Sequence, residues 1–146
     1  MRNWLFGTVL SGPFSAQLGL LVIRAGIGLM MAFSHGWGKF KIIDEFAAGV
    51  GKLGFPIPTF FAWAAALSEF LGGLLLALGL LTRPAAAMLL VTMLVAAFGQ
   101  HASDPLRVKE MALLYATFAL GFLLIGSGRF GVDALLSGRD GERRLA

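Results

Sequence analysis

Long apolar runs dominate the chain and set its predicted elements. Four such runs cover about residues 18–37, 60–81, 84–101 and 110–126. A helix needs about 20 mostly apolar residues to cross a bilayer. The second run has this length outright, and the others reach it when their polar ends are counted. Because hydrocarbon offers no partner to backbone polar groups, the runs predict four transmembrane helices.

The connections between the runs predict an antiparallel bundle. Thr82, Arg83 and Pro84 make a tight turn between the second and third runs. The connection between the first and second runs is long, and its apolar residues recur at helical spacing over about 42–53. We therefore expect a single all-α membrane domain over residues 1–146. Its four-helix bundle should carry an amphipathic or re-entrant helix between the first two spans.

The amino-acid composition is typical of a protein embedded in a lipid bilayer. Hydrophobic residues make up 58% of the 146 residues and charged residues 14%, whereas a soluble domain carries roughly 25% charged residues. This excludes a disordered chain, a coiled coil and an ordinary soluble enzyme. The absence of cysteine excludes disulfides, a thiol nucleophile and iron–sulfur clusters. No basic polar domain is present that could bind nucleic acid.

Two charged residues fall inside the predicted spans, Arg24 in the first and Glu69 near the middle of the second. One such charge at the bilayer centre costs roughly 2.5–3.5 kcal/mol on insertion scales, so it is retained where structure or function requires it. The first interpretation is a functional site that faces the bundle interior. The alternative is a structural Arg24–Glu69 ion pair, although both side chains lean toward the start of their own antiparallel helix and so away from each other.

Further polar residues are expected at one end of the bundle. His35 and Lys39 share the helical face of Arg24 in the first run, and His101 ends the parallel third run. Together with Glu110 at the start of the fourth run, they predict a polar mouth. The candidate catalytic residues are Glu69, His35 and His101, and the candidate ligand-binding residues are Arg24, His35, Lys39, Glu69, His101 and Glu110.

Plainer interpretations of the same residues stay open. The histidines suit an interfacial position, and Lys39 can extend its ammonium to lipid headgroups. Close helix packing is the plainer interpretation of the span glycines, which are Gly26, Gly28, Gly72, Gly73 and Gly79. Bis-histidine haem ligation is a weaker alternative. No metal site is predicted, because only Glu69 or Glu110 could complete one.

Four stretches together resemble the DoxX family of small bacterial inner-membrane proteins. They are LVIRAGIGLMMAFSHGWGKF at 21–40, AALSEFLGGLLLALGLLTRPAAA at 65–87, EMALLY at 110–115 and GSGRFGVDALL at 126–136. The resemblance follows the family order over nearly the whole chain. It implies a four-helix protein of the bacterial cytoplasmic membrane and carries a redox expectation, since the family name derives from a quinone-linked oxidoreductase.

The resemblance implies a membrane-embedded component of a quinone-linked oxidoreductase or an oxidative-stress complex, with a quinone and a redox protein as partners. Whether the chain is itself an enzyme is open. The alternative is a non-enzymatic small-solute transporter or a scaffold for a partner protein. Four spans are few for a transporter, so that alternative predicts a homo-oligomer.

The distribution of basic residues gives a weak prediction of orientation. Four spans put both termini on one side, and that side holds six basic residues against five on the other, with Arg24 inside a span. The positive-inside rule therefore leans toward cytoplasmic termini. The six are Arg2, Arg83, Arg129, Arg139, Arg143 and Arg144, and the five are Lys39, Lys41, Lys52, Arg107 and Lys109.

Overall fold

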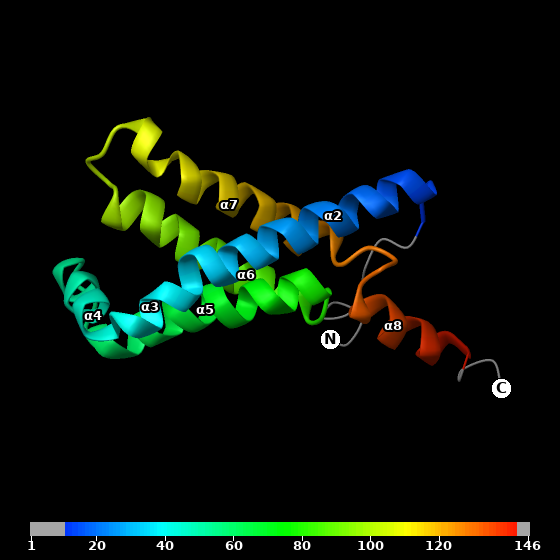
Figure 1. Ribbon diagram of the computed structural model, residues 1–146, viewed down its shortest axis with the longest axis horizontal. Helices are drawn as coiled ribbons and strands as arrows, with labels where there is room; N and C mark the ends of the chain where they lie inside the picture. Colours follow the sequence, from blue (N-terminus) through cyan, green and yellow to red (C-terminus); the bar gives the residue numbers. More distant parts are fainter. Residues whose placement is uncertain (1–10, 143–146) are drawn as a thin grey trace.

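The computed structural model describes residues 11–142, with side chains through residue 137, and this part of the chain is helical with no strand. The helices follow one another along the chain (Figure 1), and two of them continue into π-helical turns. In order they are α2 (Phe14–Met30), η1 (Met31–Gly36), α3 (Trp37–Lys41), α4 (Ile43–Lys52), α5 (Pro58–Leu78), α6 (Thr82–Val95), η2 (Ala96–Gln100), α7 (Leu106–Ile125) and α8 (Val132–Glu142).

Four continuous helices within residues 11–142 are long and apolar enough to span a membrane. They cover Phe14–Lys41, Pro58–Leu78, Thr82–Gln100 and Leu106–Ile125. The predicted all-α bundle of four spans is confirmed, and so is the amphipathic helix between the first two spans, which is α4. The first span is 28 residues long and thus extends beyond the 18–37 expected from its apolar run.

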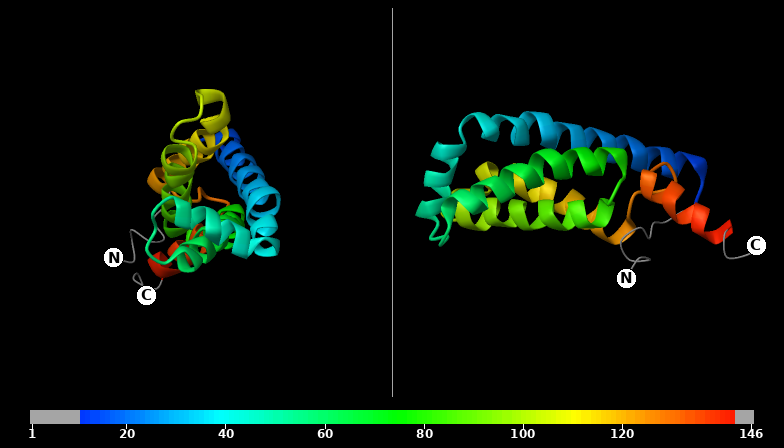
Figure 2. Two further views of the ribbon diagram at one scale, coloured as in Figure 1. Left: turned by 90° about the vertical axis from the view of Figure 1, so that its left-hand side faces the viewer. Right: turned by 90° about the horizontal axis from the view of Figure 1, so that it is seen from below.

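The bundle has two distinct ends (Figure 2). At one end, which we call the loop end, α4 crosses the bundle beside α5 and α3, and the connection 101–105 lies at the same end. At the other, the terminal end, the start of α2, the α5–α6 turn and α8 lie together. The main hydrophobic core joins α2, η1, α5, α6 and α7, with Met31, Leu76, Leu89 and Phe122 among its buried residues. A separate small cluster, including Ala47, Val50 and Ala62, fixes α4 on α5.

Helices α2 and α5 approach each other closely through small residues. A Cβ added at Gly28 would lie 2.5 Å from the carbonyl oxygen of Gly73, and one at Gly36 would lie 2.4 Å from the backbone nitrogen of Phe70. Such contacts leave no room for a methyl group. Small residues at these spacings let two transmembrane backbones pack by direct van der Waals contact. The packing interpretation is borne out at Gly28 and Gly73, whereas an added Cβ at Gly26 would meet nothing within 4 Å.

We expect Gly36→Ala to destabilise the protein by about 1–3 kcal/mol, because the added methyl group must push η1 away from α5. The matched control is Gly26→Ala on the same span, where an added Cβ meets nothing within 4 Å. The control should be neutral or stabilising by up to about 1 kcal/mol, since alanine is the better helix former. Unfolding by SDS titration, followed by circular dichroism, measures both. Equal stability of the two variants would contradict the close packing.

Candidate functional site

The buried carboxylate of Glu69 forms an ion pair with the ammonium of Lys39, which donates a hydrogen bond to Oε2. The Glu69 side chain is 3% exposed and that of Lys39 24% exposed. Side chains lean toward the start of their own helix. Lys39 lies toward the loop end from Glu69, and its helix runs antiparallel to α5, so the two side chains lean toward each other. The free-energy cost of removing the Glu69 carboxylate from water is offset here by its direct counter-ion, the Lys39 ammonium.

This ion pair lies in the wall of a groove of about 740 Å³ between α4, α5 and α6, here called the α4–α6 groove. Along α6 and η2 its lining extends from Ala87 to His101, which corresponds to about 20 Å of helix. Val91, part of this lining, is 62% exposed. The groove therefore opens sideways, on a surface that the bilayer would cover.

Polar and apolar groups are unevenly distributed along the groove. Ala87, Met88 and Val91 line its inner, apolar part, whereas Gln100 and His101 lie at the loop end. The lining from α4 is mostly apolar and includes Phe46, over whose ring the Lys39 ammonium lies at 5.1 Å. The arrangement fits a molecule with a polar head and a long apolar tail.

His101 ends the π-helical turn η2 and pairs with a neighbouring carboxylate. Its Nδ1 lies 2.7 Å from Oδ2 of Asp104. This contact orients the ring and leaves Nε2 available toward other groups. π-Helical turns inside transmembrane helices are frequent at functional sites, and here η1 and η2 lie on the two spans that supply Lys39 and His101.

Arg24 belongs to a different site, at the terminal end. It is 1% exposed, and its guanidinium donates to the carbonyl oxygens of Leu76 and Phe130, both at 3.4 Å. A Cβ at Gly79 would lie only 1.6 Å from Nη1 of Arg24, so the arginine fills its site against the backbone. Arg24 and Glu69 do not share one internal chamber in the structure. They do not form the alternative, a direct ion pair, either.

Asp133 of α8 completes the terminal-end site. Its Oδ1 and Oδ2 accept hydrogen bonds from the backbone N–H groups of Leu81 and Thr82, at 2.8 and 2.9 Å. Leu81 has a φ of 48°, a left-handed conformation that costs a leucine about 1–2 kcal/mol. The carboxylate also interacts favourably with the Arg24 charge. Asp133 thus joins α8 to the start of α6.

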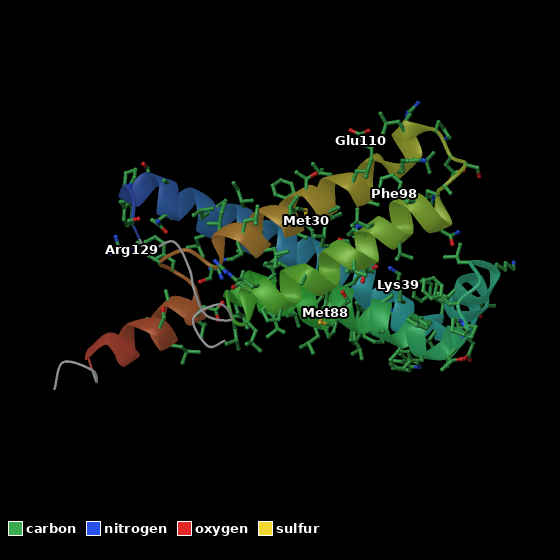
Figure 3. The ribbon with its side chains drawn as sticks, turned by 180° about the vertical axis from the view of Figure 1, so that it is seen from behind. Met30, Lys39, Met88, Phe98, Glu110 and Arg129 are labelled. Atoms are coloured by element: carbon green, nitrogen blue, oxygen red, sulfur yellow. The ribbon has the colours of Figure 1, made fainter. Side chains whose placement is uncertain are left out.

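The two remaining candidates lie outside the groove. Glu110 is exposed on the first turns of α7, away from Lys39 (Figure 3). His35 is half-buried in η1 and packs edge-on against Tyr115 of α7, with ring centroids 5.3 Å apart. Of the six candidates, Lys39, Glu69 and His101 therefore share the groove, and Arg24, His35 and Glu110 do not line it.

Sequence reasoning missed several polar residues of the interior, among them Tyr115, Thr92 and Asp133. Tyr115 is 8% exposed and lies in the main core, with its ring against that of His35. Thr92 donates to Ser68 at 3.1 Å, linking α6 to α5 beside the groove. Asp133 had a signal in the quoted GSGRFGVDALL stretch, where it is the single acidic residue. Within residues 11–142, no three His, Asp or Glu side chains converge as metal ligands would.

Comparison with known proteins agrees with this architecture. The family model described as DoxX matches residues 19–102. This range holds most of the first span and all of the second and third, and so includes Lys39, Glu69 and the α6–η2 wall of the groove. No curated protein and no solved structure matches the chain. The match covers more than half of the chain, and four helices suit a membrane. The chain is a multi-pass integral membrane protein that belongs to the DoxX family.

Proposed function

We propose that the α4–α6 groove binds a membrane-dissolved quinone and that the protein is a component of a quinone-linked oxidoreductase or oxidative-stress complex. The observation that carries this proposal is the Lys39–Glu69 ion pair in the wall of a long, mostly apolar groove that opens toward lipid. Ligand sites commonly combine a volume of about 300–1,000 Å³ and apolar walls with a few placed polar groups.

The residues present fit a quinone by the chemistry of their donors. The Lys39 ammonium has three N–H groups, of which one goes to Glu69, so others can donate to a carbonyl oxygen. His101 offers a second donor or acceptor at the loop end, and the apolar stretch from Ala87 to Val91 suits an isoprenoid tail. A bound quinone supplies two-electron, two-proton redox chemistry.

Within this proposal each residue has a definite task. Lys39 orients the head group by hydrogen bonding, and Glu69 holds the Lys39 ammonium in place and can accept a proton at Oε2. The apolar walls exclude water from the ion pair and strengthen its electrostatic interactions. The protein then lies in the bacterial cytoplasmic membrane with both termini cytoplasmic, so the polar end of the groove opens at the outer leaflet.

Transport of a small polar solute is the second candidate, and the geometry favours it less. A transport path needs polar groups that lead to both sides of the membrane. The groove lining contains no residue of the terminal-end site, where Arg24 is packed directly against Gly79. One lateral opening with a polar and an apolar end is the shape of a binding site for an amphiphile.

The proposal is tested by measuring how much quinone copurifies with the protein from a quinone-containing membrane. We expect protein purified in mild detergent to retain extractable quinone, measured by mass spectrometry and ultraviolet absorption. Glu69→Gln and Lys39→Gln should each retain at least about tenfold less, because each removes one partner of the ion pair. Glu110→Gln, on the exposed start of α7, is the matched control and should retain the wild-type amount. No quinone in any preparation, or equal amounts in all four, would contradict the proposal.

A further inference from the structure

The connection between η2 and α7 holds a histidine and a carboxylate in a fixed relation at the loop end of the groove. Nδ1 of His101 lies 2.7 Å from Oδ2 of Asp104. The backbone supports this contact, because the N–H of Asp104 donates to the carbonyl oxygen of His101 at 3.1 Å, and the N–H of His101 donates to that of Ala96 at 3.0 Å. Pro105 follows directly and restricts the backbone of Asp104. The pair is therefore part of the turn itself.

The carboxylate decides which ring nitrogen of His101 carries a hydrogen. A carboxylate only accepts hydrogen bonds, so Nδ1 is the donor in the contact with Asp104. In the neutral ring the other nitrogen, Nε2, then has no hydrogen and acts as an acceptor. His101 belongs to the groove lining and Asp104 does not. The histidine therefore presents an acceptor to a ligand while its donor is held outside the groove.

The loop end of the groove offers a ligand both kinds of hydrogen-bonding partner. The Lys39 ammonium only donates, and one of its N–H groups goes to Glu69. Nε2 of His101 accepts, and so do the carboxylate oxygens of Glu45, which also lies in the lining. A quinone carbonyl oxygen only accepts, whereas a hydroxyl of the reduced form, the quinol, both accepts and donates. Only the quinol can therefore pair with both Lys39 and His101.

We propose that the groove binds the reduced, hydroxyl-bearing form of a quinone more tightly than the oxidised form, and that Asp104 is the positioning residue that sets this preference. Asp104 acts through His101, by keeping the hydrogen on Nδ1 and the lone pair on Nε2. A site with an acceptor for a ligand hydroxyl disfavours the analogue that lacks the hydroxyl, because the acceptor then loses its partner. The preference rests on the proposed function for the class of ligand.

The first measurement determines the tautomer of His101 without any ligand. The chain has two histidines, so protein labelled with ¹⁵N-histidine gives two sets of ring signals, and His101→Gln identifies its own set by its loss. At about pH 8, where an ordinary imidazole is neutral, we expect the hydrogen on Nδ1 of His101. In Asp104→Ala it should move to Nε2, the tautomer that a free histidine side chain favours. Hydrogen on Nε2 in the wild-type protein would overturn the proposal.

The second measurement compares the two redox forms as ligands. Equilibrium dialysis of the protein in lipid nanodiscs, without oxygen and at the same pH, gives the Kd of a decyl-substituted quinone and of its quinol. The His101 side chain is 35% exposed, so water competes for Nε2 and the preference stays moderate. We expect the wild-type protein to bind the quinol about three- to tenfold more tightly. Asp104→Ala should bring the two Kd values to within about twofold of each other.

Control variants separate the tautomer from other effects of the substitution. Asp44→Ala removes an exposed carboxylate of α4 and should keep the wild-type preference. Asp104→Asn keeps the size of the side chain but can donate as well as accept, so it should weaken the preference even if Asp104→Ala unfolds the protein. Equal binding of both forms by the wild-type protein, or a preference that survives in both Asp104 variants, would overturn the inference and leave quinone binding standing. Binding of neither form would contradict the proposed function, and the preference with it.

Discussion

Lys39→Met should lower the free energy of unfolding by about 3–5 kcal/mol, because it leaves the buried Glu69 carboxylate without its counter-ion. The Glu69 side chain is 3% exposed, and its ion pair with Lys39 offsets the cost of burying the carboxylate. Methionine retains most of the apolar stem of lysine, so the loss comes from the charge. SDS titration of the purified protein, followed by circular dichroism, measures the change.

The double variant separates the ion pair from other effects of the substitution. Replacing both partners, as in Lys39→Met with Glu69→Leu, should restore most of the lost stability, since apolar replacements of buried ion pairs are often neutral or stabilising. Lys41→Met changes an exposed lysine on the same helix and should cost less than about 0.5 kcal/mol. A double variant as unstable as Lys39→Met would show that Lys39 supports the fold in another way.

Asp133→Ala should cost about 3 kcal/mol or more. It removes the acceptor of two backbone N–H groups at the start of α6, and hydrogen bonds to a charged group contribute about 1.5–3 kcal/mol each. It also removes a carboxylate that stabilises the buried Arg24 charge. The same SDS titration measures the loss, and proteolysis after α7 reports whether α8 has left the bundle.

Asp133→Asn is the graded control for this prediction. The single side-chain oxygen of asparagine can still accept a hydrogen bond from the backbone N–H of Leu81 or Thr82, but the second acceptor oxygen and the negative charge are lost. We expect a loss between those of wild type and Asp133→Ala. Asp44→Ala, at an exposed position of α4, should change stability by less than about 0.5 kcal/mol. Wild-type stability of Asp133→Ala would mean that α8 does not hold the α5–α6 turn.

Sequence patterns predicted the spans because a bilayer imposes length and apolarity on every helix that crosses it. The same argument singled out Arg24 and Glu69 as buried charges, and both are buried. The lean of helical side chains also argued correctly against pairing them directly. Applied to Lys39, the same geometry would have predicted its ion pair with Glu69.

The partners of the buried charges could not be predicted from span topology alone. Nη1 and Nη2 of Arg24 donate to the backbone carbonyls of Leu76 and Phe130. The residue types along the chain do not reveal which backbone carbonyls will act as acceptors. His35 and Glu110 were assigned to the polar mouth by their depth along the helices. Depth does not fix rotation about the helix axis, and the π-helical turns η1 and η2 change that rotation locally. The groove depends on how α4 packs across α5 and α6, which no single helix specifies.

Photoaffinity labelling with an azido-quinone tests the central claim most directly, because it reports where a quinone sits in the membrane-embedded protein. After illumination in lipid nanodiscs, mass spectrometry should place the label on groove residues between Ala87 and His101 or on α4. Excess unlabelled quinone should suppress the label, and Glu69→Gln should weaken it. Label confined to the terminal end near Arg24, or spread over lipid-facing residues without competition, would contradict a quinone site in the groove.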